Sequence, residues 1–93
     1  MKRIPRLTQR FLNRRRALGA DRGPSARTVA EAIGDLARRD LPLPDDFETL
    51  IPPVLTVHAH RVRGENLWIL YDFDQQTVTM ITLTANSPIP LDT

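Results

Sequence analysis

Two histidines and two arginines lie close together in the middle of this sequence, and these side chains are the ones best suited to chemistry. They are His58, His60, Arg61 and Arg63. Histidine exchanges a proton near neutral pH, and the planar arginine guanidinium binds phosphate through two parallel hydrogen bonds. The cluster therefore predicts a site that transfers a proton at an anionic, phosphate-like substrate, with His60 as the general base.

The geometry of a strand limits how these side chains can cooperate. Residues 54–63 are rich in the residue types of a β-strand, and successive side chains of a strand point to opposite faces. His58 and His60 are therefore expected on one face, with Arg61 and Arg63 on the other. All of them serve one site only if a bulge interrupts the strand. The alternatives are a solvated face for the two arginines and structural roles for the two histidines.

The segment His58-Ala59-His60 could also supply two ligands of a metal site, because side chains two residues apart on a strand converge. A third ligand would have to come from Asp72 or Glu65. Catalytic zinc sites need three well-spaced protein ligands, so the sequence favours no metal and no cofactor. Because the chain has no cysteine, a disulfide framework, a thiol nucleophile and a cysteine-based zinc or iron–sulfur site are excluded.

The charge of the chain is divided unevenly between its two halves. Residues 1–39 contain eleven lysines and arginines against three acidic residues, whereas residues 40–93 contain two arginines against eight acidic residues. A basic half on a small domain indicates a polyanionic partner, with nucleic acid as the first candidate, although a solvated surface would have the same composition. The arginines expected to contact its phosphates are Arg10, Arg14, Arg15 and Arg16.

No stretch of the sequence predicts a membrane span. The longest apolar run is Leu67–Tyr71, far short of the about 20 residues that cross a bilayer. Residues 1–20 are arginine-rich and free of acidic side chains, as in a mitochondrial transit peptide, but their removal would leave too little chain for a stable core. We therefore expect a single domain over residues 1–93, in the cytoplasm and without membrane contact.

Two amphipathic helices are predicted in the basic half, where they must support the rest of the domain. They cover residues 7–18 and 25–39, because apolar residues recur there at the spacing of one helix face. In the second helix Thr28 has the spacing of a capping box, and Ser25 is an alternative cap. Gly-Pro and Pro-containing segments separate these helices from each other and from the second half of the chain.

The second half of the chain predicts a meander of three strands over residues 54–63, 67–73 and 77–85. The middle strand is apolar on both faces and is expected at the centre of the sheet, whereas the threonine-rich last strand is expected at an exposed edge. Residues 2–4 could add a short fourth strand, which Pro5 makes uncertain. The predicted fold class is α+β, with two N-terminal helices packed on a small antiparallel sheet of three to four strands.

This order of elements resembles the RelE/ParE superfamily of toxins from bacterial toxin–antitoxin pairs, and it is nearest the RelE/YafQ-like branch. Residues 41–47 (Leu-Pro-Leu-Pro-Asp-Asp-Phe) resemble the leucine-proline connector of that branch. Residues 67–74 resemble the family's central strand, an apolar run with a tyrosine near its end. Residues 77–86 resemble its last strand, and residues 84–87 (Thr-Ala-Asn-Ser) stand where YafQ-like members have a Thr-His-Ser-like segment.

The resemblance implies a ribosome-dependent mRNA endoribonuclease, or mRNA interferase, that inhibits translation. Its implied partners are the ribosome, mRNA and a cognate antitoxin that covers the basic surface. Arg61 and Arg63 match the basic positions that RelE members carry before the hairpin, which implies that both bind the scissile phosphate. His60 would then be the base that activates the 2′-hydroxyl, and the arginines between residues 10 and 16 would bind RNA.

The C-terminal part departs from the family pattern. Asn86 stands where YafQ-like toxins carry a functional histidine, and Ile89-Pro90 replace an aromatic residue. Asn86 is the candidate catalytic residue by position, but an amide is neither an acid nor a base near neutral pH. Two alternatives therefore stay open: a non-catalytic ParE-type toxin that acts on a protein such as DNA gyrase, and a plain nucleic-acid-binding module.

Overall fold

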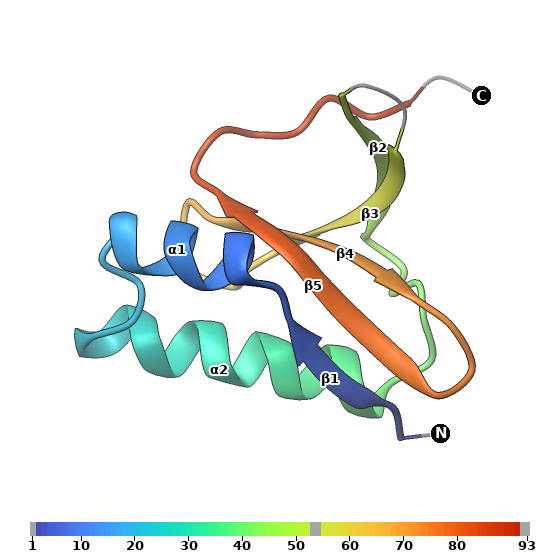
Figure 1. Ribbon diagram of the computed structural model, residues 1–93, viewed down its shortest axis with the longest axis horizontal. Coiled ribbons are helices and arrows are strands. Elements are labelled where there is room, and N and C mark those ends of the chain that lie inside the picture. The colour runs from blue at the N-terminus through green and yellow to red at the C-terminus, as the bar shows by residue number, and fades with distance from the viewer. Residues whose placement is uncertain (1, 53–54, 92–93) are drawn as a thin grey trace.

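The chain folds into five strands and two helices in the computed structural model, which describes residues 2–52 and 55–91. The elements follow one another as β1 (Ile4–Leu7), α1 (Gln9–Ala17), α2 (Gly23–Arg38), β2 (Phe47–Ile51), β3 (Leu55–Arg61), β4 (Trp68–Phe73) and β5 (Thr77–Thr84). The strands form one sheet in the order β1-β5-β4-β3-β2 (Figure 1). The predicted α+β class is confirmed.

Both helices cover the same face of the sheet, and the main core lies between these two layers (Figure 1). Its fully buried side chains include Phe11 from α1, Val29 and Leu36 from α2, and Ile69 and Met80 from β4 and β5. Only Phe11 is buried on α1, so most of this arginine-rich helix faces solvent. No helix in the described part of the chain is long and apolar enough to cross a membrane.

The start of α2 differs from the prediction. The helix begins at Gly23, two residues earlier than expected, and neither predicted cap residue caps it. The Thr28 hydroxyl instead donates to the carbonyl of Pro24, one turn earlier, at 3.1 Å. The Ser25 hydroxyl donates to Glu65 at 2.6 Å. Proline near the first helical position explains the early start, because its fixed φ suits a helix and its missing N–H needs no partner there.

The sheet corrects the predicted one in two respects, since it has five strands rather than three or four and is mixed rather than antiparallel. The meander is confirmed as β3, β4 and β5, with β4 at the centre of the sheet. Residues 47–51 add β2, which pairs antiparallel with β3. Prolines at positions 44 and 52 flank this segment, and they bound a short strand that sequence reasoning treated as part of a connection.

The predicted edge position of the last strand is wrong, because β1 covers the outer side of β5. β1 runs parallel to β5 and pairs Ile4 with Thr77. The amides of Ile4 and Thr8 donate to carbonyls of residues 76 and 80, so the nitrogen of Pro5 between them faces away from β5. Proline is tolerated there because the outer side of an edge strand needs no donor.

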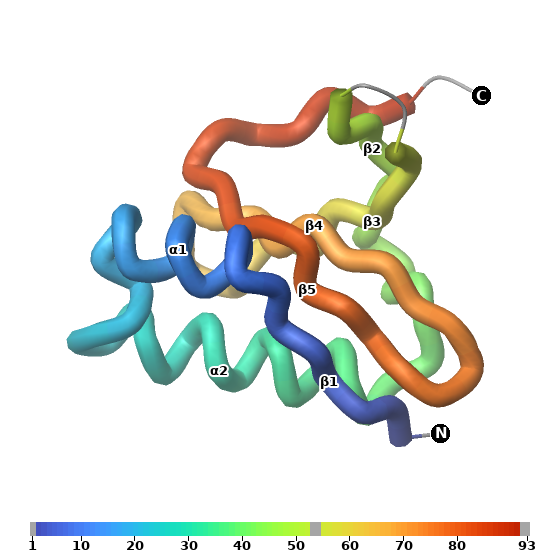
Figure 2. Tube along the Cα trace, viewed as in Figure 1, coloured from blue at the N-terminus to red at the C-terminus, as the bar shows by residue number. Residues whose placement is uncertain are grey.

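The C-terminal segment leaves β5 and returns across the second face of the sheet towards β2 (Figure 2). The Thr49 hydroxyl donates to the carbonyl of Ile89 at 2.8 Å, and the amide of Leu91 donates to the carbonyl of Glu48 at 2.9 Å. A smaller apolar cluster lies on this face and includes Val57 and Leu70. The sheet is therefore covered by helices on one face and partly by this segment on the other.

Candidate active site

The connector between α2 and β2 carries an acidic side chain into the molecule. Leu43 is buried in the main core and anchors the connector. A turn comes next, in which the amide of Asp46 donates to the carbonyl of Leu43 at 3.0 Å. The side chain of Asp46 is only 2% exposed. A buried carboxylate is costly unless hydrogen-bond donors surround it, so its partners are decisive for this part of the fold.

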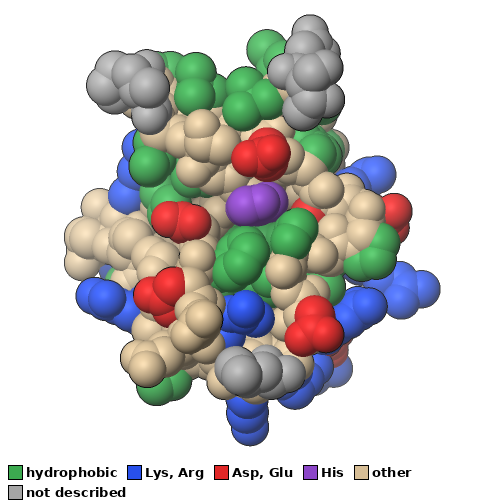
Figure 3. Space-filling model, turned by 90° about the vertical axis from the view of Figure 1, so that its right-hand side faces the viewer, with side chains coloured by type: hydrophobic (Ala, Val, Ile, Leu, Met, Phe, Trp, Pro, Cys, Tyr) green, Lys and Arg blue, Asp and Glu red, His purple; other side chains and the backbone are tan. Residues whose placement is uncertain are grey.

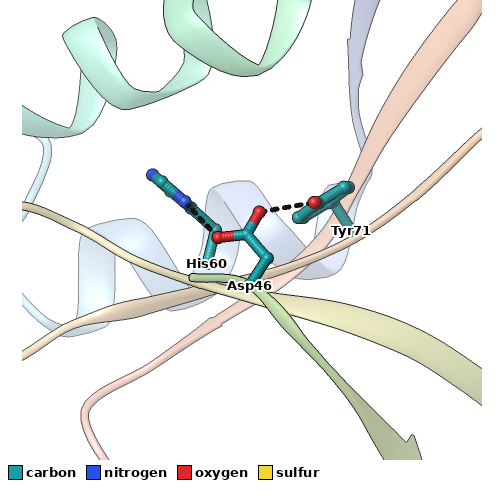
Figure 4. Close-up of polar contacts among 3 residues, drawn as sticks. All are labelled: Asp46, His60 and Tyr71. Atoms are coloured by element: carbon teal, nitrogen blue, oxygen red, sulfur yellow. Dashed lines mark hydrogen bonds and ion pairs between the residues drawn. The ribbon is translucent and has the colours of Figure 1, made fainter. Parts of the chain in front are cut away.

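Asp46 joins two strands through its two carboxylate oxygens (Figure 4). The hydroxyl of Tyr71, on β4, donates to Oδ2 at 2.5 Å. Nδ1 of His60, on β3, lies 2.8 Å from Oδ1. Three elements that are separate along the chain therefore meet in one polar network, which we call the Asp46 network.

Tyr71 is a permanent donor in this network. Its side chain is fully buried, and burial raises the pKa of its hydroxyl far above the ordinary value, with the hydrogen bond to Asp46 and the negative charge of Asp46 raising it further. The phenol therefore stays protonated at neutral pH. Because an ionised carboxylate has no proton to donate, the bond between the two side chains has one direction, from the Tyr71 hydroxyl to Asp46.

His60 lies at the junction between the Asp46 network and an open groove. The groove has a volume of about 1150 Å³ and runs between α2, the connector and the end of β3. The His60 side chain is 17% exposed, and its second ring nitrogen points away from Asp46 and Tyr71 (Figure 4). One nitrogen of the imidazole is therefore held by a buried carboxylate, while the other is available to a bound molecule.

Arginines and carboxylates share the walls of this groove. Arg39, Arg61 and Arg63 line it together with four carboxylates, those of Glu31, Asp35, Asp45 and Asp46. Both signs of charge also occur on the face of the molecule that Figure 3 shows, where carboxylates and apolar side chains surround one histidine and most lysine and arginine side chains lie towards the rim. The groove therefore offers cations for an anionic group beside a side chain that can exchange a proton.

Strand alternation holds at the end of β3, because His60 lies on the same face as Tyr71 and Arg61 lies on the opposite face, over Trp68. The groove is nevertheless lined by His60 and by both arginines, so no bulge in β3 is needed to bring them to one site. β3 ends at Arg61, and Val62 turns inward, fully buried, with its amide bound to the carbonyl of Leu67 at 2.9 Å. Arg61 extends over the ring of Trp68, with its guanidinium carbon 5.7 Å from the ring centroid. Arg63 follows in the turn, so all three predicted residues line one groove.

His58 has a different environment from His60. Its ring stacks on Tyr71 at 5.5 Å between centroids and tilts against Phe73 at 5.4 Å. Its Nδ1 is buried without a hydrogen-bond partner among the described residues. The possible metal ligand Glu65 accepts a hydrogen bond from Ser25 instead. No group of three or more His, Asp or Glu side chains in residues 2–52 and 55–91 could hold a metal ion.

Asn86 lines a second groove, different from the groove of His60, although the pairing of Thr84 with Trp68 and of Trp68 with Arg61 places the two residues at the same end of the sheet. This groove has a volume of about 720 Å³ and runs between α1, β2 and the C-terminal segment. The backbone amide of Asn86 donates to the hydroxyl of Thr84 at 3.1 Å, which fixes the chain at the end of β5. The structure therefore does not bring Asn86 together with His60, and the four predicted catalytic residues divide between two grooves.

The four predicted RNA-binding arginines of α1 lie in different environments. Arg10 and Arg14 line the second groove, and Arg16 is exposed on the helix surface. Arg15 has a structural role, because its guanidinium donates to the carbonyls of Ala20 and Ala26 at 3.0 Å each. It holds the connection between α1 and α2. The Arg14 guanidinium also donates within the fold, to the carbonyl of Leu83 at 3.3 Å, and it does so from an exposed position on the helix, as Arg10 and Arg16 are exposed.

Sequence reasoning missed the roles of Asp46 and Tyr71 at this site. A tyrosine inside an apolar strand is a usable signal, because a buried phenol needs a hydrogen-bond partner. The sequence does not name that partner, since Asp45 and Asp46 are adjacent and equally acidic. Only the path of the connector selects Asp46.

Comparison with known proteins leaves this site without a family assignment. No protein-family model matches the chain, and no curated protein or solved structure shows significant similarity to it. The resemblance to RelE-like toxins therefore stays a prediction that rests on the residues quoted for it.

Proposed function

We propose that this domain is a metal-independent endoribonuclease of the RelE-like toxin type, which cuts mRNA on the ribosome and thereby inhibits translation. The observation that carries the proposal is the position of His60, held by a buried carboxylate at the wall of a groove that Arg61 and Arg63 also line. A general base beside phosphate-binding cations is what cleavage by the 2′-hydroxyl of RNA requires.

In the proposed reaction Nε2 of His60 takes the proton of the 2′-hydroxyl while the 2′-oxygen bonds to the adjacent phosphorus. The bond from phosphorus to the 5′-oxygen breaks, and that oxygen takes a proton from water. The products are a 2′,3′-cyclic phosphate and a 5′-hydroxyl, and His60 then returns its proton to solvent. Arg61 and Arg63 stabilise the negative charge that develops on the phosphorane.

The exposed arginines of α1 supply the proposed contacts with the ribosome or the message. Arg10, Arg14 and Arg16 belong to the basic half of the chain and lie on a helix with one buried residue. Cations on such a surface attract polyanions and raise the rate of encounter. The proposed partners are the ribosome, mRNA and a cognate antitoxin, and the proposed location is the cytoplasm.

The proposal is tested by primer extension on mRNA from a purified translation system to which the protein has been added. We expect cuts only while ribosomes translate, and we expect His60→Gln to lower the cutting rate by about 10²–10⁴-fold because it removes the general base. His58→Gln is the matched control, since it changes the other histidine of the same strand, and it should keep the cutting pattern. Intact message with the wild-type protein would refute the proposed nuclease.

A second candidate function is supported by one observation. Asn86, which stands where YafQ-like toxins have a histidine, lies in a different groove from His60. A toxin that binds a protein such as DNA gyrase needs no such catalytic pair. Inhibition of gyrase supercoiling by the purified protein, together with intact message in the translation assay, would favour this ParE-type function.

A further inference from the structure

We propose that Asp46 and Tyr71 are positioning residues, which hold neutral His60 in the tautomer that carries its proton on Nδ1 and leaves Nε2 free to accept a proton in the groove. The catalytic consequence of this inference rests on the proposed nuclease function. The tautomer itself does not, because it follows from the hydrogen bonds of the folded chain.

The direction of each hydrogen bond in the Asp46 network identifies the tautomer. An ionised carboxylate only accepts hydrogen bonds. Tyr71 already donates to Oδ2, so the atom 2.8 Å from Oδ1, Nδ1 of His60, must be the donor to the other oxygen. The opposite tautomer would place the lone pair of Nδ1 against a carboxylate oxygen at this distance, which is repulsive.

Tyr71 contributes by preventing Asp46 from turning. The ring of Tyr71 is fully buried and stacks against His58, so its hydroxyl has one position. With Oδ2 bound to that hydroxyl, the carboxylate plane is fixed and Oδ1 stays directed at His60 (Figure 4). Exposure of 2% leaves little room for water to replace either donor. The ring of His60 is therefore oriented by Asp46, which lines the groove beside it, and Asp46 is in turn held from the core by Tyr71.

The Asp46 network also stabilises the positive charge that the His60 ring acquires when it accepts a proton. When Nε2 accepts a proton, Nδ1 already donates to a carboxylate, and the bond becomes charge-assisted without any rearrangement. An amide in place of the carboxylate would supply neither the charge nor a fixed direction, because it contains a donor as well as an acceptor. Asp46→Asn keeps the size of the side chain and removes the carboxylate, so it tests the orienting role of the carboxylate separately from the volume that the side chain fills.

The tautomer is measured directly from the ¹⁵N chemical shifts of the two imidazole nitrogens of His60 in the intact protein at a pH where the ring is neutral. The chain has two histidines, so His60→Gln assigns the signals. We expect wild-type His60 to carry its proton on Nδ1, and we expect Asp46→Asn to produce a mixture of tautomers. Tyr71→Phe should produce a smaller admixture, because Asp46 keeps its charge but loses one anchor.

The cleavage assay then separates this inference from the proposed function. If the protein is the proposed nuclease, Asp46→Asn should lower the cutting rate at saturating ribosomes by about 10²-fold or more while leaving ribosome binding unchanged. Wild-type His60 with its proton on Nε2, or in a mixture, would overturn the positioning role whatever the activity. The Nδ1 tautomer in a protein that cuts no message would retain the positioning role and refute the nuclease. Because the wild-type measurement needs no variant, a misfolded variant does not prevent the test.

Discussion

Replacing Tyr71 by phenylalanine removes one oxygen atom from the Asp46 network and keeps the buried ring. The lost hydroxyl donates at 2.5 Å to a carboxylate that is 2% exposed, so Oδ2 of Asp46 loses its donor where water has little access. Leaving a buried acceptor unsatisfied costs about 1–3 kcal/mol, and more when the acceptor is charged. We therefore expect Tyr71→Phe to lower the free energy of unfolding by about 2 kcal/mol, which corresponds to about 8–16 °C in Tm for a domain of this size.

The effect is measured by urea unfolding at neutral pH, followed by the fluorescence of Trp68, the single tryptophan of the chain. Thr82→Val is the control, because it also removes a hydroxyl from a buried residue. The Thr82 hydroxyl, unlike that of Tyr71, has no hydrogen-bond partner among the described residues. This variant should change stability by less than about 0.5 kcal/mol. A double-mutant cycle with Asp46→Asn should show that the two changes are not additive. Additive effects, or a loss for Tyr71→Phe no larger than that of the control, would refute the reasoning.

Two further predictions concern the surface. Arg15→Ala should lower the free energy of unfolding by about 1–3 kcal/mol, because its guanidinium donates to the carbonyl of Ala20 in the α1–α2 connection and to that of Ala26 in α2. The same change at the exposed neighbour, Arg16→Ala, should be nearly neutral, and equal urea midpoints for the two variants would contradict this difference. Asp74 accepts hydrogen bonds from the amides of Gln76 and Thr77, which lower its pKa. Its stabilising contribution should therefore be complete above the unfolded pKa of about 3.9 and disappear as the pH falls through the lower folded value. In acid titrations of unfolding, the stability difference between wild type and Asp74→Ala should shrink below that range, and a difference independent of pH would count against it.

Local signals in the amino-acid sequence were enough to predict most of the elements. Strands β3, β4 and β5 follow from runs of β-branched and aromatic residues that short turns separate, and both helices follow from the spacing of their apolar residues. Leu67–Tyr71 predicted the central strand, because an apolar run on both faces must be covered from both sides. The cluster of His60, Arg61 and Arg63 was likewise visible, since the three residues lie within four positions of one another.

The meeting of distant segments, in contrast, depends on the packed fold. β1 pairs with β5 from opposite ends of the chain, and no local pattern records that pairing. Asp46 is one of two adjacent aspartates in a proline-rich connector, and it reaches His60 and Tyr71 because Leu43 anchors that connector beside β3 and β4. The same packing places Asn86 and His60 in the linings of two different grooves. The physical reason is that a buried polar group is satisfied by whichever partner the packed fold brings within reach, and that partner depends on the whole core rather than on sequence spacing.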